Sequence, residues 1–207
     1  MEKFKKVFAH VLKILKWAFL ILVGVFIILV IARIPHALNQ QKTDAQIIKI
    51  HNTKLTLPDV MGENLPPYPG VEADKTVQGI DANNNGIRDD VELAIFKEYP
   101  NSAKTRAVLL QYALTLQMEV MQPIINTSTA TEVAREQSRA YVCIGDVLSR
   151  ENLEKFNKEA DTFTNFVKER MFNTEERKNN RSIFVDNVRS YSNLEQKCDI
   201  DLFILSN

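Results

Sequence analysis

The stretch from Asp81 to Glu92 places oxygen-bearing residues at the alternating positions that a hard cation needs. It reads Asp-Ala-Asn-Asn-Asn-Gly-Ile-Arg-Asp-Asp-Val-Glu and fits the pattern D-x-[DN]-x-[DN]-G-x5-E at every specified position. Because Ca²⁺ takes about six to eight oxygen ligands, a short chain must curl around it, and Gly86 permits the sharp turn. The predicted ligands are Asp81, Asn83, Asn85, the backbone carbonyl of Ile87, Asp89 directly or through water, and Glu92 as a bidentate carboxylate.

These twelve residues resemble the EF-hand loop, and more narrowly the single-loop, dockerin-like calcium motifs of secreted and envelope proteins. The resemblance covers residues 81 to 99, and no second loop of this kind occurs in the chain. Residues 57 to 70 carry four prolines and two glycines, so no helix is expected to lead into the loop. Loop position eight, usually apolar in EF-hands, is Arg88 here. A lone loop with three ligating carboxylates is expected to hold a structural ion with a Kd of about 10⁻⁴ to 10⁻³ M.

The same residues also fit an Asn-rich turn before a helix. Asp89, Asp90 and Glu92 would then favour the helix N-terminus through its dipole and free amides. The two interpretations are compatible. Turn chemistry alone does not explain why Glu92 falls at the closing position of a loop that also has glycine sixth.

Residues 1 to 36 combine a basic tail with an apolar segment, which is typical of a transmembrane signal-anchor. The uninterrupted apolar run covers residues 17 to 32, and a span from about Val11 to Ile34 is reached if the lysines within it snorkel. A cleaved signal peptide is the alternative, but residues 32 to 37 offer no small-x-small cleavage site. Five lysines precede the uninterrupted apolar run, so the N-terminus is expected in the cytoplasm and the rest in the periplasm or outside the cell.

Charge and cysteine content agree with this single-pass arrangement. The chain has 26 basic and 26 acidic residues, and residues 1 to 37 hold six of the basic and one of the acidic ones. The remainder therefore has 20 basic and 25 acidic residues, which argues against a nucleic-acid partner. Cys143 and Cys198 both lie in the exported part, so one intramolecular disulfide is expected; a pair of buried free thiols is the alternative.

The hydrophobic pattern predicts an all-α fold in three parts: the tail and anchor at 1–36, a proline-rich linker and loop-entry segment at 37–80, and the calcium loop with a helical domain at 81–207. Residues 37 to 56 fit either a helix continuing from the anchor or a tether, whereas residues 57 to 80 are expected to be extended. About five helices in a bundle-like domain are predicted from periodicity and capping signals, at residues 88–99, 102–121, 129–148, 150–172 and from 175 onward.

The sequence lacks the residues of the common catalytic sites in its helical domain. All three histidines, His10, His36 and His51, fall in the anchor or linker, so neither a histidine base nor a His-rich zinc site is expected in the folded domain. The sequence favours a non-enzymatic, membrane-anchored module of the cell envelope that carries one Ca²⁺ and binds another envelope protein. The alternatives are a small membrane-tethered hydrolase using carboxylates such as Glu132 and Glu136, or an inhibitor or immunity-type protein.

Overall fold

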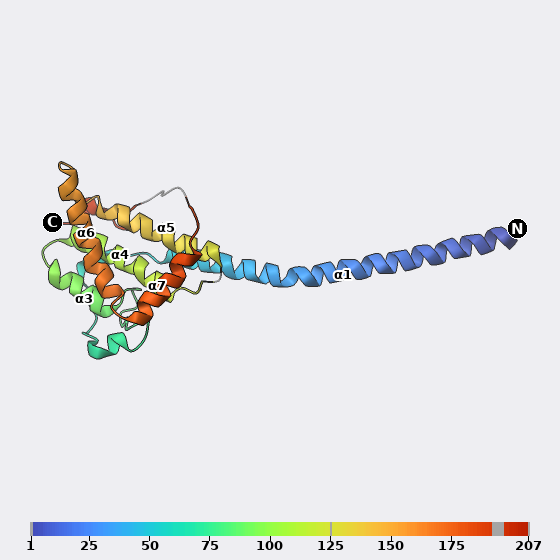
Figure 1. Ribbon diagram of the computed structural model, residues 1–207, viewed down its shortest axis with the longest axis horizontal. Helices are drawn as coiled ribbons and strands as arrows, with labels where there is room; N and C mark the ends of the chain where they lie inside the picture. Colours follow the sequence, from blue (N-terminus) through green and yellow to red (C-terminus); the bar gives the residue numbers. More distant parts are fainter. Residues whose placement is uncertain (1, 125, 192–196, 207) are drawn as a thin grey trace. The chain divides into compact units, whose positions relative to one another are not determined.

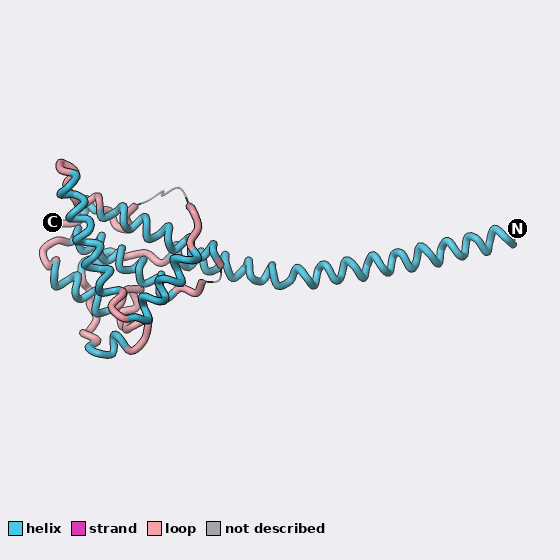
Figure 2. Tube along the Cα trace, viewed as in Figure 1, coloured by secondary structure: helices cyan, strands magenta, loops and turns pink. Residues whose placement is uncertain are grey.

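The computed structural model describes residues 2–124, 126–191 and 197–206, and every regular element in these ranges is helical (Figure 2). This confirms the predicted all-α class for the described part of the chain. The chain divides into two compact units, Met1–Asp44 and Ala45–Asn207.

The first unit is one helix. α1 (Glu2–Asn52) runs through it without a break, passes Pro35, and its last turns belong to the second unit (Figure 1). The apolar side chains between Val11 and Ile34 are exposed, and the helix is long and apolar enough to cross a membrane. Of the two alternatives for residues 37 to 56, the structure shows the helix as far as Asn52.

The second unit holds the remaining elements. They are α2 (Leu57–Met61), η1 (Gly70–Asp74), α3 (Asp89–Glu98), α4 (Ala103–Met121), α5 (Thr127–Ile144), α6 (Leu153–Met171), α7 (Glu175–Asn187) and η2 (Leu202–Ile204). The helices α3 to α7 correspond to the five predicted ones. Three boundaries differ by more than one residue. α5 begins at Thr127, after the Asn126 cap, and ends at Ile144 instead of 148, and α6 begins at Leu153, after the Asn152 cap; each cap accepts backbone N–H groups with its side-chain oxygen.

Helix α4 is the centre of the second unit. It packs against α3, α5, α6 and α7, and almost all of its residues are buried (Figure 1). The Ser102 hydroxyl accepts the N–H of Thr105 at 3.1 Å and fixes the start of the helix. Among the described helices, α4 is the most buried.

The approach to the loop is not the extended linker that its prolines predicted. α2 forms because the Thr56 N–H donates to the Asp59 carboxylate at 2.9 Å, and because Pro58 stands in the first turn, where its missing N–H costs nothing. Val60 in α2 and Ala73 in η1 are buried in the second unit. Pro58 is therefore compatible with the start of a short helix and does not prevent one.

Cys143 and Cys198 lie at disulfide distance, with their sulfur atoms 2.03 Å apart. Cys143 is on α5 and Cys198 belongs to the C-terminal segment, which also places Leu205 in the core. The bond therefore holds this segment against α5.

Glu119 on α4 is a buried carboxylate that gives the fold a pH dependence. It is 3 % exposed, lies 3.5 Å from Arg181 Nε on α7, and accepts no hydrogen bond from any described residue. Burial raises the pKa of Glu119 from 4.5 to about 7, although Arg181 and Lys168 act to lower it. The folded state therefore binds this proton more tightly than the unfolded chain does.

We expect Glu119 to stabilise the fold fully below about pH 4.5 and to lose that contribution as the pH rises through about 7. The free energy of unfolding of the wild type, taken relative to a Glu119→Gln variant in the same buffer, should fall over this interval. Urea titrations of the fragment from residue 37 onward at a series of pH values measure it. A difference between the two proteins that stays constant with pH would contradict the assignment.

Candidate metal centre

The predicted calcium loop lies between Ile80 and the first turn of α3. The Asp89 N–H donates to the Ile80 carbonyl at 2.9 Å and closes the loop at its base. Gly86 has φ 85°, the left-handed conformation expected at the sixth position. A Cβ there would lie 2.7 Å from Leu114 Cδ1, so any larger residue would also force this α4 side chain to shift.

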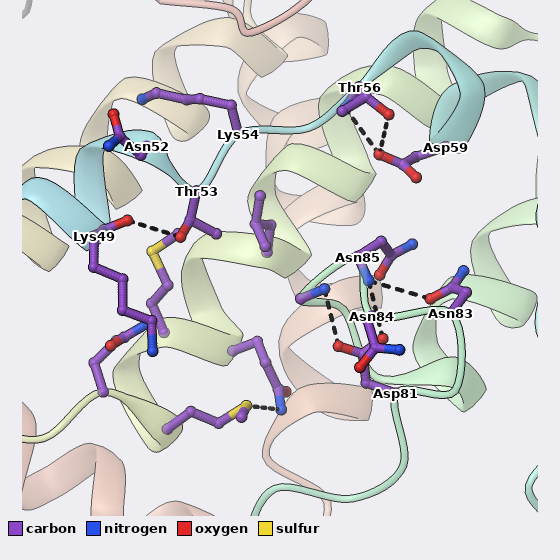
Figure 3. Close-up of a pocket in the computed structure, with 16 residues that line it drawn as sticks. Lys49, Asn52, Thr53, Lys54, Thr56, Asp59, Asp81, Asn83, Asn84 and Asn85 are labelled. Atoms are coloured by element: carbon purple, nitrogen blue, oxygen red, sulfur yellow. Dashed lines mark hydrogen bonds between the residues drawn. The ribbon is translucent and has the colours of Figure 1, made fainter.

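Backbone N–H groups curl the loop around Asp81. Its two carboxylate oxygens accept from the N–H groups of Asn85 at 3.1 Å and Gly86 at 2.9 Å (Figure 3). The side-chain oxygen of Asn85 in turn accepts the N–H of Ile87 at 2.9 Å. Side chains from the start and middle of the loop are thereby held facing its interior, as the predicted ligand pattern requires.

Glu92 reaches the same place from α3. Its Oε2 accepts from Asn83 Nδ2 at 3.1 Å and its Oε1 from Asn85 Nδ2 at 3.0 Å. Loop positions three, five and twelve therefore meet in space. Each amide carries an oxygen on the same carbon as its nitrogen, but turning that oxygen toward a cation would break the bond from Asn83 to the Asn64 carbonyl and the bond from the Ile87 N–H to Asn85.

The charge of Glu92 is not compensated by the protein. Its side chain is 1 % exposed, and no described Lys, Arg or His lies within ion-pair distance of it. Burial raises the pKa of Glu92 to about 7, although the bonds from Asn83 and Asn85 lower it. Asp59 and Asp89 raise it further by repulsion. A cation in the loop would relieve this repulsion.

The other two predicted ligands are differently placed. Asp89 is fully buried, and its carboxylate oxygens accept the N–H of Ala82 at 3.0 and 3.2 Å. Burial raises the pKa of Asp89 above its ordinary value, although the bond from Ala82 acts to lower it. The Ile87 side chain is fully buried, which leaves the backbone carbonyl as its contribution. Within the described residues, no three His, Cys, Asp or Glu side chains gather closely enough to hold a metal. An ion here would therefore need the amide oxygens as well.

Helix capping accounts for only part of this arrangement. The N-cap of α3 is Arg88, whose side chain makes no capping bond. Asp89 binds the N–H of Ala82, and Glu92 binds the loop amides, so neither carboxylate satisfies a free N–H of α3 itself. Their interaction with the helix dipole stays favourable in both interpretations.

Arg88, the departure from the EF-hand pattern, has a structural role that sequence reasoning missed. It is fully buried and donates to the Asp90 carboxylate at 2.6 and 2.7 Å. It also donates to the Arg170 carbonyl at 2.7 Å and to the Met171 carbonyl at 3.4 Å, both at the end of α6. The side chain thus ties the loop to α6.

His51, which was expected in the linker, lies in the second unit and contacts α5. His51 Nδ1 lies 3.0 Å from Glu136 Oε1, and His51 Nε2 lies 3.2 Å from Glu132 Oε2. Burial acts to raise the pKa of Glu136, but bonds from Lys54 and Arg139 outweigh it and hold the pKa below its ordinary value. The four-residue spacing of Glu132 and Glu136 shows from sequence alone that they share one face of α5. Their contact with His51 on α1 could not be predicted, because His51 is distant in sequence.

Comparison of the chain with protein-family models, with curated proteins and with solved structures found no match. What the loop can do is therefore inferred from its own chemistry. It offers hard oxygen donors and buried negative charge, which suit a Ca²⁺ ion better than a softer metal.

Proposed function

We propose that this chain is a membrane-anchored extracytoplasmic protein whose helical domain binds another envelope component and holds one structural Ca²⁺. The proposed ligands are Asp81, Asn83, Asn85, the Ile87 carbonyl, Asp89 and Glu92. The ion fixes the approach segment and the loop against the start of α3, and the domain then presents a stable surface to its partner.

The observation that carries the proposal is the state of Glu92. A buried carboxylate is costly unless it is paired with a cation, and here its contacts are two neutral amides. A divalent cation bound among these oxygens would offset that cost. Asn83 donates to the Asn64 carbonyl at 3.0 Å, a bond to the approach segment that its amide would exchange for the ion on turning its oxygen inward.

Three features support the placement outside the cytoplasm. α1 is a candidate membrane span, lysines gather near its N-terminal end, and the sulfur atoms of Cys143 and Cys198 lie at disulfide distance in the part beyond it. An oxidising compartment is where such a bond persists, and millimolar Ca²⁺ is found in the same kind of compartment.

The calcium proposal is tested by thermal melts of the fragment from residue 37 onward. With a Kd of about 10⁻⁴ to 10⁻³ M, about 10 mM Ca²⁺ should stabilise the wild type by about 1.4 to 2.7 kcal/mol relative to chelator, following RT ln(1 + [L]/Kd). Glu92→Gln should lose most of that gain, because it removes the closing charged ligand while keeping the side-chain volume.

Glu98→Gln is the matched control, since Glu98 is exposed on the same helix and is not a proposed ligand. It should keep the full calcium-dependent shift of Tm. If the wild type melts identically in calcium and in chelator, the loop is only an Asn-rich helix cap.

The topology is tested with the full chain in sealed membrane vesicles whose outer face corresponds to the extracytoplasmic side. Carbonate washing should leave the protein in the membrane, and protease added outside should digest the helical domain while the N-terminal tail stays protected. Release by carbonate, or a mature N-terminus near residue 38, would contradict the anchor. Protection of the helical domain in these vesicles would reverse the proposed orientation.

A further inference from the structure

Asn85 and Gly86 form an Asn-Gly pair, the dipeptide at which an asparagine side chain converts most readily to a carboxylate. The backbone nitrogen of the glycine attacks the side-chain carbon of the asparagine, and glycine has no Cβ to hinder the approach. The sequence contains no second Asn-Gly pair. Both residues lie on the loop and are partly exposed to water. Asn85 is therefore the asparagine of this chain whose sequence context suits the reaction best.

The reaction consumes only water and releases ammonia. The Gly86 nitrogen gives up its proton and bonds to Asn85 Cγ, while the Cγ–Nδ2 bond breaks and ammonia leaves with that proton. Water then opens the resulting succinimide ring. Cleavage between Cγ and the Gly86 nitrogen gives aspartate, whereas cleavage between the Asn85 backbone carbonyl carbon and that nitrogen gives isoaspartate, which carries Cβ in the main chain.

Hydrogen bonds hold the groups that this reaction rearranges. The Gly86 N–H donates to Asp81 Oδ2 at 2.9 Å. Asn85 Nδ2 donates to Glu92 Oε1 at 3.0 Å, and Asn85 Oδ1 accepts the Ile87 N–H at 2.9 Å. The reaction removes the proton of the first bond and the nitrogen of the second, so the closed loop must give up both. The closed loop therefore protects Asn85.

Opening of the loop frees both groups at once. Surface loops open locally at a lower cost than global unfolding, and the rate of reaction then follows the fraction of open loops. A Ca²⁺ ion among the proposed ligands would hold the loop closed and bind the amide oxygen of Asn85. If the ion binds only the closed loop, it lowers the open fraction by the factor 1 + [L]/Kd.

We infer that Asn85 is a site of spontaneous deamidation, and that the loop from Asp81 to Glu92 controls the reaction by closing over the Asn85–Gly86 pair. The place of the reaction follows from the sequence and the loop contacts alone. Its dependence on calcium rests on the proposed function, because it requires the ion to bind.

The two products change the loop in different ways. Aspartate at position 85 keeps the pattern D-x-[DN]-x-[DN]-G-x5-E and adds a fourth carboxylate to the proposed ligands, so the loop should bind Ca²⁺ more tightly. Isoaspartate lengthens the main chain directly before Gly86, where the backbone turns with φ 85°. It should therefore displace the ligands on the two sides of this turn and weaken the site. Either product alters the loop irreversibly.

The test incubates the full chain in lipid nanodiscs, with about 10 mM Ca²⁺ or with chelator. Trypsin releases residues 76–88, which contain Asn83, Asn84 and Asn85, and fragmentation of this peptide shows which of them has become an acid. Digestion in heavy-oxygen water marks any deamidation that occurs during preparation. A synthetic peptide of the same residues gives the rate for an open loop. Asn101, an exposed asparagine before Ser102, is the internal reference.

In chelator, Asn85 should deamidate about tenfold or more slowly in the protein than in the peptide. Calcium should slow it by a further factor of about 10 to 100, which follows from a Kd of about 10⁻⁴ to 10⁻³ M. Asn85→Gln should abolish the reaction at this position, because the larger ring of glutamine closes much more slowly. Glu92→Gln should lose the calcium effect, whereas Glu98→Gln should keep it. The rate at Asn101 should not depend on calcium.

Equal rates for Asn85 in the protein and in the peptide would overturn control by loop closure, and reaction mainly at Asn83 or Asn84 would overturn the site. An unchanged or faster rate in calcium, in a protein that calorimetry shows to bind the ion, would overturn the calcium dependence. If calorimetry finds no binding and calcium has no effect, while Asn85 still reacts more slowly than in the peptide, the calcium site fails and the loop-controlled deamidation site stands.

Discussion

Replacing Arg177 by methionine is expected to destabilise the second unit by about 3 to 5 kcal/mol. Arg177 on α7 is fully buried and donates to the backbone carbonyls of Ala73, Thr76 and Val77 at 2.5 to 3.0 Å. It also pairs with the Asp74 carboxylate at 2.6 Å. Methionine fills similar space but donates nothing, so three carbonyls and a carboxylate would lose their partner at once.

Urea unfolding of the fragment from residue 37 onward measures this loss. Arg150→Met is the control, because Arg150 is exposed before α6 and its pair with Asp146 should contribute less than about 1 kcal/mol. A similar small loss for both variants would show that Arg177 does not hold the approach segment in place.

Removing the link between Cys143 and Cys198 is expected to cost about 3 to 4 kcal/mol. The two residues are 55 apart in sequence, and cross-linking them restricts the unfolded chain. The link is reinforced nearby, since Asp199 pairs with Arg139 at 2.5 Å and its N–H donates to Gln111 at 2.8 Å. These contacts should keep the C-terminal segment partly docked even without the bond.

The measurement compares urea midpoints of the oxidised wild type, the reduced wild type and a Cys143→Ala, Cys198→Ala double variant. The reduced protein and the variant should unfold at similar, lower urea concentrations. Labelling of both thiols in the unfolded but unreduced protein would show that the cysteines are not bonded. An unchanged midpoint on reduction would show that the bond does not stabilise the fold.

The helices that sequence predicted well are those whose signals are local. Ser102 and Thr174 each cap the helix that follows with a side-chain oxygen, which is a signal carried by neighbouring residues alone. The short helix α2 was missed although its signal was present, because Thr56 and Asp59 have capping-box spacing and Pro58 follows the cap. The prolines further along the segment favour an extended chain, but they lie beyond the end of α2 at Met61 and do not prevent it.

Burial of charged residues could not be predicted. Arg88, Arg106 and Arg177 resemble any surface arginine in sequence, yet all three are buried and donate to backbone carbonyls of distant segments. A guanidinium can satisfy several acceptors at once, so it can hold a loop that no strand supports. Which arginine does so depends on contacts between residues up to about 100 positions apart, and these leave no local pattern.

The candidate site was predictable in its residue types and spacing but not in its surroundings. The sequence places an oxygen donor at each expected loop position, and the fold brings Asn83, Asn85 and Glu92 together. The depth at which Glu92 is buried follows from α4 and the approach segment packing around the loop. The turning of Asp89 toward Ala82 is likewise a tertiary effect.

The central claim is that residues 81 to 92 bind one Ca²⁺, and calorimetric titration of Ca²⁺ into the full chain in lipid nanodiscs tests it most directly. We predict one site with a Kd of about 10⁻⁴ to 10⁻³ M, abolished in Glu92→Gln and kept in Glu98→Gln, with empty nanodiscs as the blank. The absence of binding heat above that blank up to several times this concentration, together with identical melting of the protein in calcium and in chelator, would contradict the account.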